Sequence, residues 1–272
     1  QITCRSEDSV VREAEALTRL PGFKGYIHDV GGPTANFRHP SCKGQLTRGL
    51  CKNKQCLAPA PCPAMEADHR DYLHLLRRLR ALPGIKKVFI RSGIRYDYLM
   101  ADPDESFFRE LVAHHISGQL KVAPEHCSAH VLRYMGKPPI ETYKRFQKRF
   151  YELTKSMGKK QYLVPYLMSS HPGSTLRDAV EQLGDTEQEA FFVWCNYKSR
   201  DLSEEDADDL IKNFWDEYQG QYDDEEDFAY RIVEECYDLP EFAKTYFDYE
   251  KFARDLFMCD YWFDDGFVFR AA

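Results

Sequence analysis

Short apolar runs alternate with longer amphipathic stretches over the first two thirds of the chain. Three amphipathic stretches end in a turn that contains glycine, as at Leu82-Pro83-Gly84, and a run rich in β-branched and aromatic residues follows each. With a fourth run between the second and third, these segments are 23–29, 85–91, 119–123 and 161–168. Glycine after a helix end lets the chain turn, and short apolar runs are typical of buried parallel strands. The pattern predicts an α/β fold that contains part of a parallel β/α barrel.

The loops that follow the four predicted strands are polar or rich in glycine. They are 31–36, 92–95, 124–126 and 169–173. In parallel β/α folds, ligands bind at the carboxyl ends of the strands. We therefore expect these loops to form the rim of a cofactor site.

Two local signals predict the ends of a helix in this part of the chain. Asp102 followed by Pro103 is typical of a helix start, because aspartate caps free amide groups and proline fits the first turn. His114 and His115 lie at the end of that stretch. Adjacent helical side chains point about 100° apart, so the two imidazoles suit the C-terminal helix dipole better than one shared metal ion.

Residues after about position 200 follow a different pattern. Amphipathic periodicity predicts three helices, over 203–218, 224–237 and 249–258. Apolar residues flank Asp264-Asp265-Gly266 within the final stretch 261–269, which predicts a hairpin around an Asp-Gly turn. The sequence thus predicts a second, small α+β module.

The charge balance reverses near Gly184. Residues 185–272 hold 26 Asp and Glu against 8 Lys and Arg, a net charge of −18, whereas residues 1–184 carry +11, within a total of −7. All nine histidines precede residue 172. Such a change predicts one domain over 1–184 and another over 185–272, and the opposite charges favour different partners.

The sequence also bears on location. No apolar run approaches the roughly 18 residues needed to span a bilayer, and the first twenty residues are charged and amphipathic, unlike a signal peptide. Nine cysteines without an export signal favour a reducing compartment. We therefore expect a cytoplasmic protein with no membrane partner.

Four cysteines, Cys42, Cys51, Cys56 and Cys62, fall in one loop rich in proline and lysine. Four thiolates suit zinc or an iron–sulfur cluster, and a long loop favours a tether. Their spacing, C-x8-C-x4-C-x5-C, is looser than the paired C-x2-C of many zinc sites. The alternatives are a metal held by these cysteines and unliganded thiols in an insertion.

The strand-end segments HDVGGPTANFRHPSC, KKVFIRSGIRYD, GQLKVAPEH and QYLVPYLMSSHPG, in this order, closely resemble the YgiQ-type radical-SAM family over residues 1 to about 183. The resemblance implies a cavity for S-adenosylmethionine. Gly31 and Gly32 would let the backbone approach the methionyl end of that cofactor. The resemblance places six further residues on the cavity wall: Arg91, Ser92, Glu125, His126, Ser170 and His171.

The chain departs from the radical-SAM pattern in one respect. Those enzymes hold a [4Fe–4S] cluster through cysteines spaced C-x3-C-x2-C, and no cysteines of this sequence have that spacing. The protein orients such a cofactor, while cofactor and cluster supply the chemistry. The resemblance then implies an inactive barrel fragment, with S-adenosylmethionine a ligand only of a competent barrel. The alternative is a radical-SAM enzyme fragment that takes its iron–sulfur cluster from another chain.

Ten acidic residues fall within 22 positions of the second part. They are Asp206, Asp208, Asp209, Asp216, Glu217, Asp223, Asp224, Glu225, Glu226 and Asp227. Aromatic residues such as Trp215 and Tyr222 lie between them, which indicates a folded acidic surface and not a disordered tail. Acidic runs of this kind are ordinarily solvated faces. Two interpretations therefore stay open, a solvated face and a surface that binds a partner.

The second part also resembles the C-terminal part of the ArdA antirestriction family over about residues 189–271, through its YFDYEKFARDLF stretch and terminal hairpin. ArdA proteins are dimers whose carboxylates imitate DNA phosphates and occupy the DNA channel of type I restriction–modification enzymes. A duplex carries about one negative charge per 1.7 Å, so a rigid surface with similar carboxylate spacing can enter the same basic groove. The resemblance implies an acidic DNA mimic.

Together the two resemblances imply a fusion or chimera. Its expected function is antirestriction inhibition by the C-terminal module, joined to the inactive barrel fragment. The expected partner is a type I restriction–modification enzyme or another DNA-binding protein, without direct contact to nucleic acid. The resemblance to ArdA also implies a homodimer formed through the C-terminal module.

Overall fold

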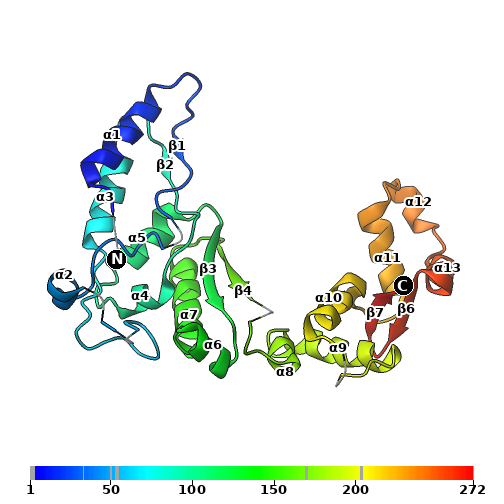
Figure 1. The fold of residues 1–272 in the computed structure, drawn as a ribbon. Coiled ribbons are helices and arrows are strands. Elements are labelled where there is room, and N and C mark those ends of the chain that lie inside the picture. The colour runs from blue at the N-terminus through cyan, green and yellow to red at the C-terminus, as the bar shows by residue number, and fades with distance from the viewer. Residues whose placement is uncertain are drawn as a thin grey trace. The chain divides into compact units, whose positions relative to one another are not determined.

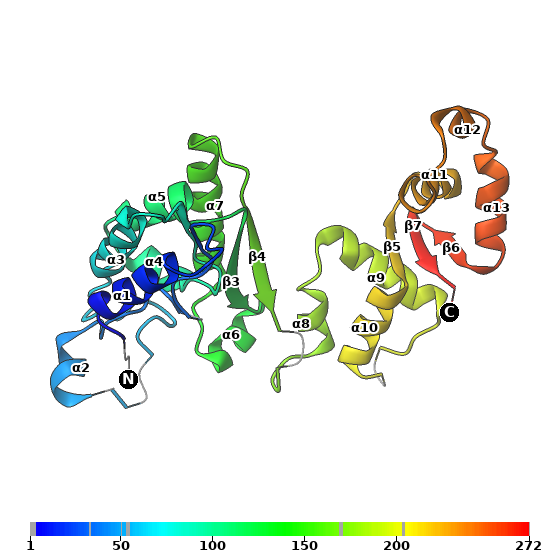
Figure 2. The same cartoon turned by 90° about the horizontal axis from the view of Figure 1, so that it is seen from above.

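The computed structural model describes residues 4–32, 34–49, 51–52, 55–168, 171–202 and 205–271. It divides into two compact units, Gln1–Met168 and Ser169–Ala272. Figure 1 and Figure 2 show the elements of each unit from two directions. Each unit has its own hydrophobic core, and the two are described separately.

The first unit holds four short strands in the four predicted segments. Its elements are α1 (Glu7–Thr18), β1 (Tyr26–Ile27), α2 (Lys43–Arg48), α3 (Arg70–Ala81), β2 (Lys87–Val88), α4 (Tyr96–Ala101), α5 (Ser106–Glu110), the π-helix η1 (Leu111–His115), β3 (Gln119–Glu125), α6 (Ala129–Met135), α7 (Ile140–Ser156) and β4 (Tyr162–Leu167). β1 pairs with β2 and β3 pairs with β4, both in parallel. Among the described residues these pairs form two separate sheets, so the barrel stays a prediction.

Two amphipathic helices supply much of the first core. α3 buries Tyr72, Leu76 and Leu79, and α7 buries Phe146 and Phe150. Spacings of three and four residues place such side chains on one helical face. They join β2 and β3 in one continuous apolar cluster, and α1 packs beside α3 (Figure 1).

The outer edge of β4 offers few free hydrogen-bond donors. The amide groups of Tyr162 and Met168 donate to the β3 side, to Gly118 O and Glu125 O. The outward amide of Leu163 donates to the Tyr151 hydroxyl, at 3.4 Å. Pro165 has no N–H, and proline is typical of such protected edge strands.

The helix start predicted at Asp102 differs from the structure, whereas the helix end predicted at His115 coincides with the end of η1. Asp102 ends α4, and α5 begins only at Ser106. His115 is fully buried, and its Nδ1 lies 2.8 Å from Val88 O. Burial lowers the pKa of His115 to about 4, so the imidazole is neutral at pH 7. The predicted interaction of a charged His115 with the helix dipole is therefore wrong.

The second unit combines helices with an antiparallel sheet. Its elements are α8 (Leu176–Val180), α9 (Asp185–Tyr197), α10 (Ala207–Glu217), β5 (Tyr218–Gln221), α11 (Glu225–Cys236), α12 (Glu241–Thr245), α13 (Tyr249–Cys259), β6 (Tyr261–Asp264) and β7 (Phe267–Arg270). The strand order is β5-β7-β6, and α11 packs against α13 (Figure 2). The three predicted helices are present as α10, α11 and α13, which confirms them.

The predicted hairpin is also confirmed. β6 and β7 pair antiparallel across a two-residue loop. Asp265 and Gly266 in that loop have φ angles of 49° and 82°. Positive φ at both central residues is the requirement of a type I′ turn, which matches the twist of the strands.

The division at Met168 lies before the change in charge at Gly184. Ala179, Val180 and Leu183 share a core with Phe191 and Phe214, so α8 packs with the second unit. The capping box of Thr175 and Asp178 starts α8 locally. Charge describes the surface, whereas the core of the second unit begins earlier in the chain.

Within the described residues, no helix is long and apolar enough to cross a membrane.

Candidate functional site

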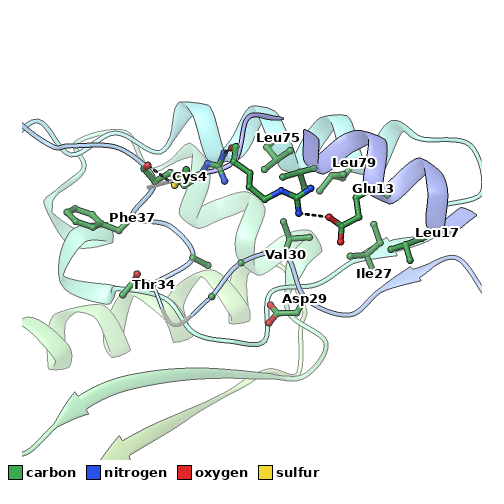
Figure 3. A pocket seen from close by; sticks show the side chains of 17 residues that line it. Cys4, Glu13, Leu17, Ile27, Asp29, Val30, Thr34, Phe37, Leu75 and Leu79 are labelled. Atoms are coloured by element: carbon green, nitrogen blue, oxygen red, sulfur yellow. Dashed lines mark hydrogen bonds and ion pairs between the residues drawn. The ribbon is translucent and has the colours of Figure 1, made fainter. Parts of the chain in front are cut away.

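A cavity of about 620 Å³ lies beside the glycine loop of the first unit. Figure 3 shows Leu17 of α1, Ile27 of β1 and Leu75 of α3 around it. The full lining is Cys4, Arg5, Val10, Glu13, Ala14, Leu17, Ile27, Asp29, Val30, Gly31, Gly32, Thr34, Ala35, Phe37, Arg38, Leu75 and Leu79. Gly31 and Gly32 are the predicted cofactor residues that border it. The α1 residues were not predicted, although Val10, Ala14 and Leu17 follow helical spacing.

The glycine loop requires glycine at one of its two positions. Gly31 has a φ of 153°, and a Cβ there would lie 2.3 Å from the Cβ of Ala35. A Cβ on Gly32 would meet nothing within 4 Å. The backbone conformation of the loop thus requires glycine at position 31, whereas position 32 borders open space.

Asp29 brings three predicted site residues together at the ends of β1 and β2. Its Oδ1 accepts hydrogen bonds from the amides of Arg91, at 2.8 Å, and Ser92, at 3.3 Å. The Ser92 hydroxyl lies 3.2 Å from that oxygen and 3.0 Å from Gly32 O. Asp29 was not a predicted site residue, although it ends a predicted strand.

Glu125 and His126 lie at the end of β3. Glu125 has a φ of 71°, which is rare outside glycine, and its Oε1 accepts from Lys137 Nζ at 3.0 Å. His126 is fully buried, and its Nδ1 accepts from the Ser128 amide at 2.9 Å. Burial raises the pKa of nearby Tyr96, and the Glu125 charge adds to that rise.

The fourth predicted loop cannot be assigned to this cavity. Ser170 lies outside the described residues. His171 belongs to the second unit, where its Nδ1 accepts from the Gly173 amide at 3.2 Å. That Ser170 and His171 line the same cavity as Gly31 stays a prediction.

The cysteine loop shows some local order. The Cys62 amide donates to Cys56 O at 2.8 Å, and Gln45 Nε2 lies 3.6 Å from Cys56 Sγ. In the described ranges, no three His, Cys, Asp or Glu side chains are gathered so as to hold a metal ion. The structure therefore adds no support for zinc or an iron–sulfur cluster at Cys42, Cys51, Cys56 and Cys62, and that site stays a prediction.

Part of the acidic surface serves helix starts. The Asp206 carboxylate accepts from the amides of Asp208 and Asp209 and caps α10. Asp224 caps α11 by accepting from the Asp227 amide at 2.8 Å. Carboxylates here satisfy free N–H groups and favour the positive end of the helix dipole. The local folding of α10 and α11 thus places acids in two clusters.

Glu217 is held inside the second unit. Its side chain is 12% exposed, and it accepts from Trp194 Nε1 at 2.8 Å and Lys198 Nζ at 3.0 Å. The exposed acids of the predicted surface whose carboxylates cap no helix, form no ion pair and accept no hydrogen bond within the described residues are Asp209, Asp216, Asp223, Glu225 and Glu226. These five, and not Glu217, are available to a partner.

Residues 171–269 match the sequence model of the family described as Antirestriction protein (ArdA). The matched range lies within the second unit. No solved structure matches the chain.

The N-terminal region is similar to UPF0313 proteins, the family that includes YgiQ-like radical-SAM proteins. A UPF0313 protein of Clostridium perfringens (strain SM101 / Type A) is 66% identical over 179 residues, 66% of this chain and 27% of the relative. One of Clostridium botulinum (strain Okra / Type B1) is 60% identical over 177 residues, 65% of this chain and 28% of the relative. The chain spans about a quarter of the length of these curated relatives.

These similarities support both family resemblances, each for its own region of the chain. Residues 171–269 are thus similar to an antirestriction family, and the N-terminal region is similar to UPF0313 proteins. That the two were joined as a chimera stays a prediction.

Proposed function

We propose that the second unit is an antirestriction inhibitor that presents carboxylates in place of DNA phosphates. The observation that supports this most is the set of exposed acids fixed on α10 and α11, among them Asp216, Glu225 and Glu226. A mimic must hold its charges in a fixed arrangement, and helices packed on a common sheet do so. The partner is a type I restriction–modification enzyme, whose DNA channel attracts phosphates.

The test separates surface position from total charge. In the full chain, Asp216→Asn, Glu225→Gln and Glu226→Gln remove three negative charges from the proposed surface. The matched control removes three exposed acids elsewhere in the unit, through Glu189→Gln, Asp255→Asn and Asp264→Asn. We expect the first triple variant to inhibit DNA cleavage by a type I enzyme about tenfold less well, and the control to be nearly unchanged.

A change of salt and two contrary outcomes test the proposal further. Raising the salt from about 50 to 200 mM should weaken inhibition, because screening shortens the reach of the charges. Equal losses in both triple variants would show that only net charge matters. A folded protein that never protects DNA would leave the acids as a solvated face.

We also propose that the second unit forms a homodimer, as the resemblance to ArdA implies. Phe242 of α12 and Tyr246, the residue after this helix, are 76% and 77% exposed, and their ring centroids lie 5.2 Å apart. Adjacent exposed aromatic rings can belong to an apolar interaction patch. Sedimentation equilibrium should show a dimer that Phe242→Ser together with Tyr246→Ser dissociates. A monomer at all concentrations would contradict this.

A second candidate function belongs to the first unit, the binding of S-adenosylmethionine at the glycine loop. The observation that favours it is the 620 Å³ cavity bordered by Gly31 and Gly32, a volume typical of small-molecule sites. Asp29 contributes a carboxylate to the cavity wall, and the Arg5–Glu13 ion pair contributes a guanidinium and a second carboxylate. These side chains suit a zwitterionic amino-acid end.

Gly32→Ala tests this second function. The new methyl group would occupy open space, so the fold should persist while the close approach of a ligand is blocked. Calorimetric titration with S-adenosylmethionine should show about tenfold weaker binding, roughly the effect of 1.4 kcal/mol. The control is Gly158→Ala, whose Cβ also meets nothing within 4 Å and lies outside the cavity. Because Gly158 has a φ of 61°, it is the more strained of the two substitutions, so weaker binding by Gly32→Ala alone cannot come from backbone strain. Equal binding by the unaltered protein and Gly32→Ala would contradict this site.

A further inference from the structure

A buried polar network joins the glycine loop to α3 and α4. Asn36 and His69 are 1% and 2% exposed, and the Asp102 side chain is 5% exposed. Asn36 Nδ2 lies 3.0 Å from His69 Nε2, and His69 Nδ1 lies 2.6 Å from Asp102 Oδ2. Burying a polar group lowers the stability of the fold unless the group forms hydrogen bonds. A series of three buried polar side chains linked by hydrogen bonds is therefore a specific feature of this unit.

The direction of each hydrogen bond follows from the backbone of Arg95. Its N–H donates to Asn36 Oδ1 at 2.8 Å, and its carbonyl accepts from Asn36 Nδ2 at 3.1 Å. This pair of bonds fixes the orientation of the amide. The second hydrogen on Nδ2 is then directed to His69 Nε2, which must accept.

The protonation of His69 is fixed in the same way. Because Nε2 accepts, the proton lies on Nδ1 and is donated to the Asp102 carboxylate. The backbone N–H of His69 donates to the same oxygen at 3.1 Å. A proton on Nε2 would face the amide hydrogens of Asn36, so the hydrogen bonds select the Nδ1–H tautomer.

The surroundings of His69 support a rigid position. Its ring stacks on Phe107, with centroids 4.7 Å apart and planes within 5°. Tyr98 lies at 4.9 Å, and its hydroxyl accepts from the Asp68 amide. The Asp68 carboxylate is paired with Arg70. The two charged residues on either side of His69 in the sequence, Asp68 and Arg70, are thus paired with each other.

The network holds one end of the glycine loop, and Asp29 holds the other. Asp29 fastens the start of the loop to the amides of Arg91 and Ser92 after β2. Asn36 fastens its end to Arg95, in the same stretch of chain. Gly31 and Gly32 lie between the two attachments, which restrain the backbone on both sides of the glycine pair.

We propose that Asn36, His69 and Asp102 are positioning residues that preorganise the glycine loop for its ligand. A loop already held in its binding shape loses little conformational freedom on binding. The proposal rests on the second function proposed above, ligand binding in the first unit. The shape of the loop can be measured without any ligand.

Asn36→Asp is the informative variant. The new carboxylate has no hydrogen to donate to His69 Nε2 or to Arg95 O, so these two acceptors repel it and its bond to the Arg95 amide should open more often. Hydrogen exchange at the Arg95 and Phe37 amides should become about tenfold faster, as loss of a hydrogen bond predicts. Exchange at the Phe89 amide, which bonds to Ile27 O, should stay unchanged. Binding of S-adenosylmethionine should weaken by a similar factor.

Nitrogen NMR of His69 gives a readout that general destabilisation would not change. The unaltered protein should show two widely separated ¹⁵N resonances, with the proton on Nδ1. In Asn36→Asp, the new carboxylate can accept from Nε2, so the proton should redistribute between the two ring nitrogens and the two resonances should converge. Thr154→Val, which removes another buried hydrogen bond, serves as the control and should change neither.

The outcomes separate the two proposals. Unchanged exchange at Arg95 and Phe37 in Asn36→Asp, or a proton on Nε2 of the unaltered His69, would overturn the positioning role. A loosened loop with unchanged ligand affinity would overturn it as well. If the unaltered protein binds no S-adenosylmethionine, the second function fails, while hydrogen exchange still decides whether the network holds the loop.

Discussion

His115 shows how one buried side chain can control stability. Its imidazole lies inside the first unit, and its Nδ1 donates to Val88 O. Nε2 has no hydrogen-bond partner within the described structure. Protonation would therefore place a charge in an apolar region without a partner.

We expect the first unit to lose stability as the pH falls from about 6.5 to about 4. The pKa of His115 is lowered by burial, from 6.5 to about 4, so the unfolded chain binds more protons in this window and stability rises with pH. The full loss is at most about 3 kcal/mol. Urea unfolding at several pH values would measure it.

His115→Gln should flatten this pH dependence, since glutamine does not titrate. His28→Gln is the control, because His28 is exposed and forms no ion pair within the described residues, and its change should leave the slope as it was. Parallel pH profiles for all three proteins would disprove the role of His115.

Gly31 and Gly32 should respond differently to the same substitution. Gly31→Ala places a methyl group against Ala35 in a backbone conformation that disfavours side chains. We expect a loss of about 1–3 kcal/mol in the free energy of unfolding. Gly32→Ala should change stability little, because its Cβ meets open space. Thermal unfolding of both variants checks this, and equal midpoints would contradict it.

The glycine residues and Ser92 could be predicted from the sequence, whereas the network at His69 could not. A glycine pair after an apolar run is a local signal. Asn36 and His69 are 33 positions apart, and so are His69 and Asp102. No short spacing reveals such contacts. Asp102 also carried a false local signal, because Asp-Pro is typical of a helix start while this side chain binds His69.

At the scale of elements, local chemistry explains which predictions were confirmed. α10, α11 and the β6–β7 hairpin start or turn at aspartates whose side chains or φ angles define the element. β1 was predicted over 23–29 and spans only Tyr26–Ile27. Gly25, with a φ of 86°, interrupts the extended backbone before it.

The N-cap of α11 provides a test at this scale. Asp224→Ala should lower the free energy of unfolding of the second unit by about 1 kcal/mol, because the Asp227 amide loses its acceptor. Asp224→Asn should restore most of that loss, since asparagine also caps helices. Asp223→Ala removes an equal charge without a cap and is the control. Denaturant unfolding that ranks Asp223→Ala with Asp224→Ala would contradict the capping role.

At the scale of the whole molecule, surface and core give different boundaries. The change in charge at Gly184 is visible in the sequence because acids are easily counted. The packing of Ala179, Val180 and Leu183 on Phe191 is long-range and appears only in the structure. The composition therefore predicted a second module, but it did not predict that α8 belongs to that module.

Two fragments of the second unit test this boundary. We expect residues 169–272 to unfold cooperatively, and residues 185–272 to be less stable by several kcal/mol, since the shorter fragment exposes the surface that α8 covers. Circular dichroism during urea titration would compare them, with Leu176→Ala in the longer fragment as a milder step. Equal midpoints would show that α8 adds nothing to the unit.

The protected edge of β4 bears on how the protein behaves in concentrated solution. Fibrils grow when an open strand edge templates another chain, and uncapped apolar strands are the usual starting points. Tyr151 occupies one outward donor of β4, and Pro165 removes another. Solutions should therefore stay clear on storage despite the exposed Tyr162 and Tyr166. Pro165→Val combined with Tyr151→Phe should make the protein bind thioflavin T and scatter light within days, whereas Tyr134→Phe should not.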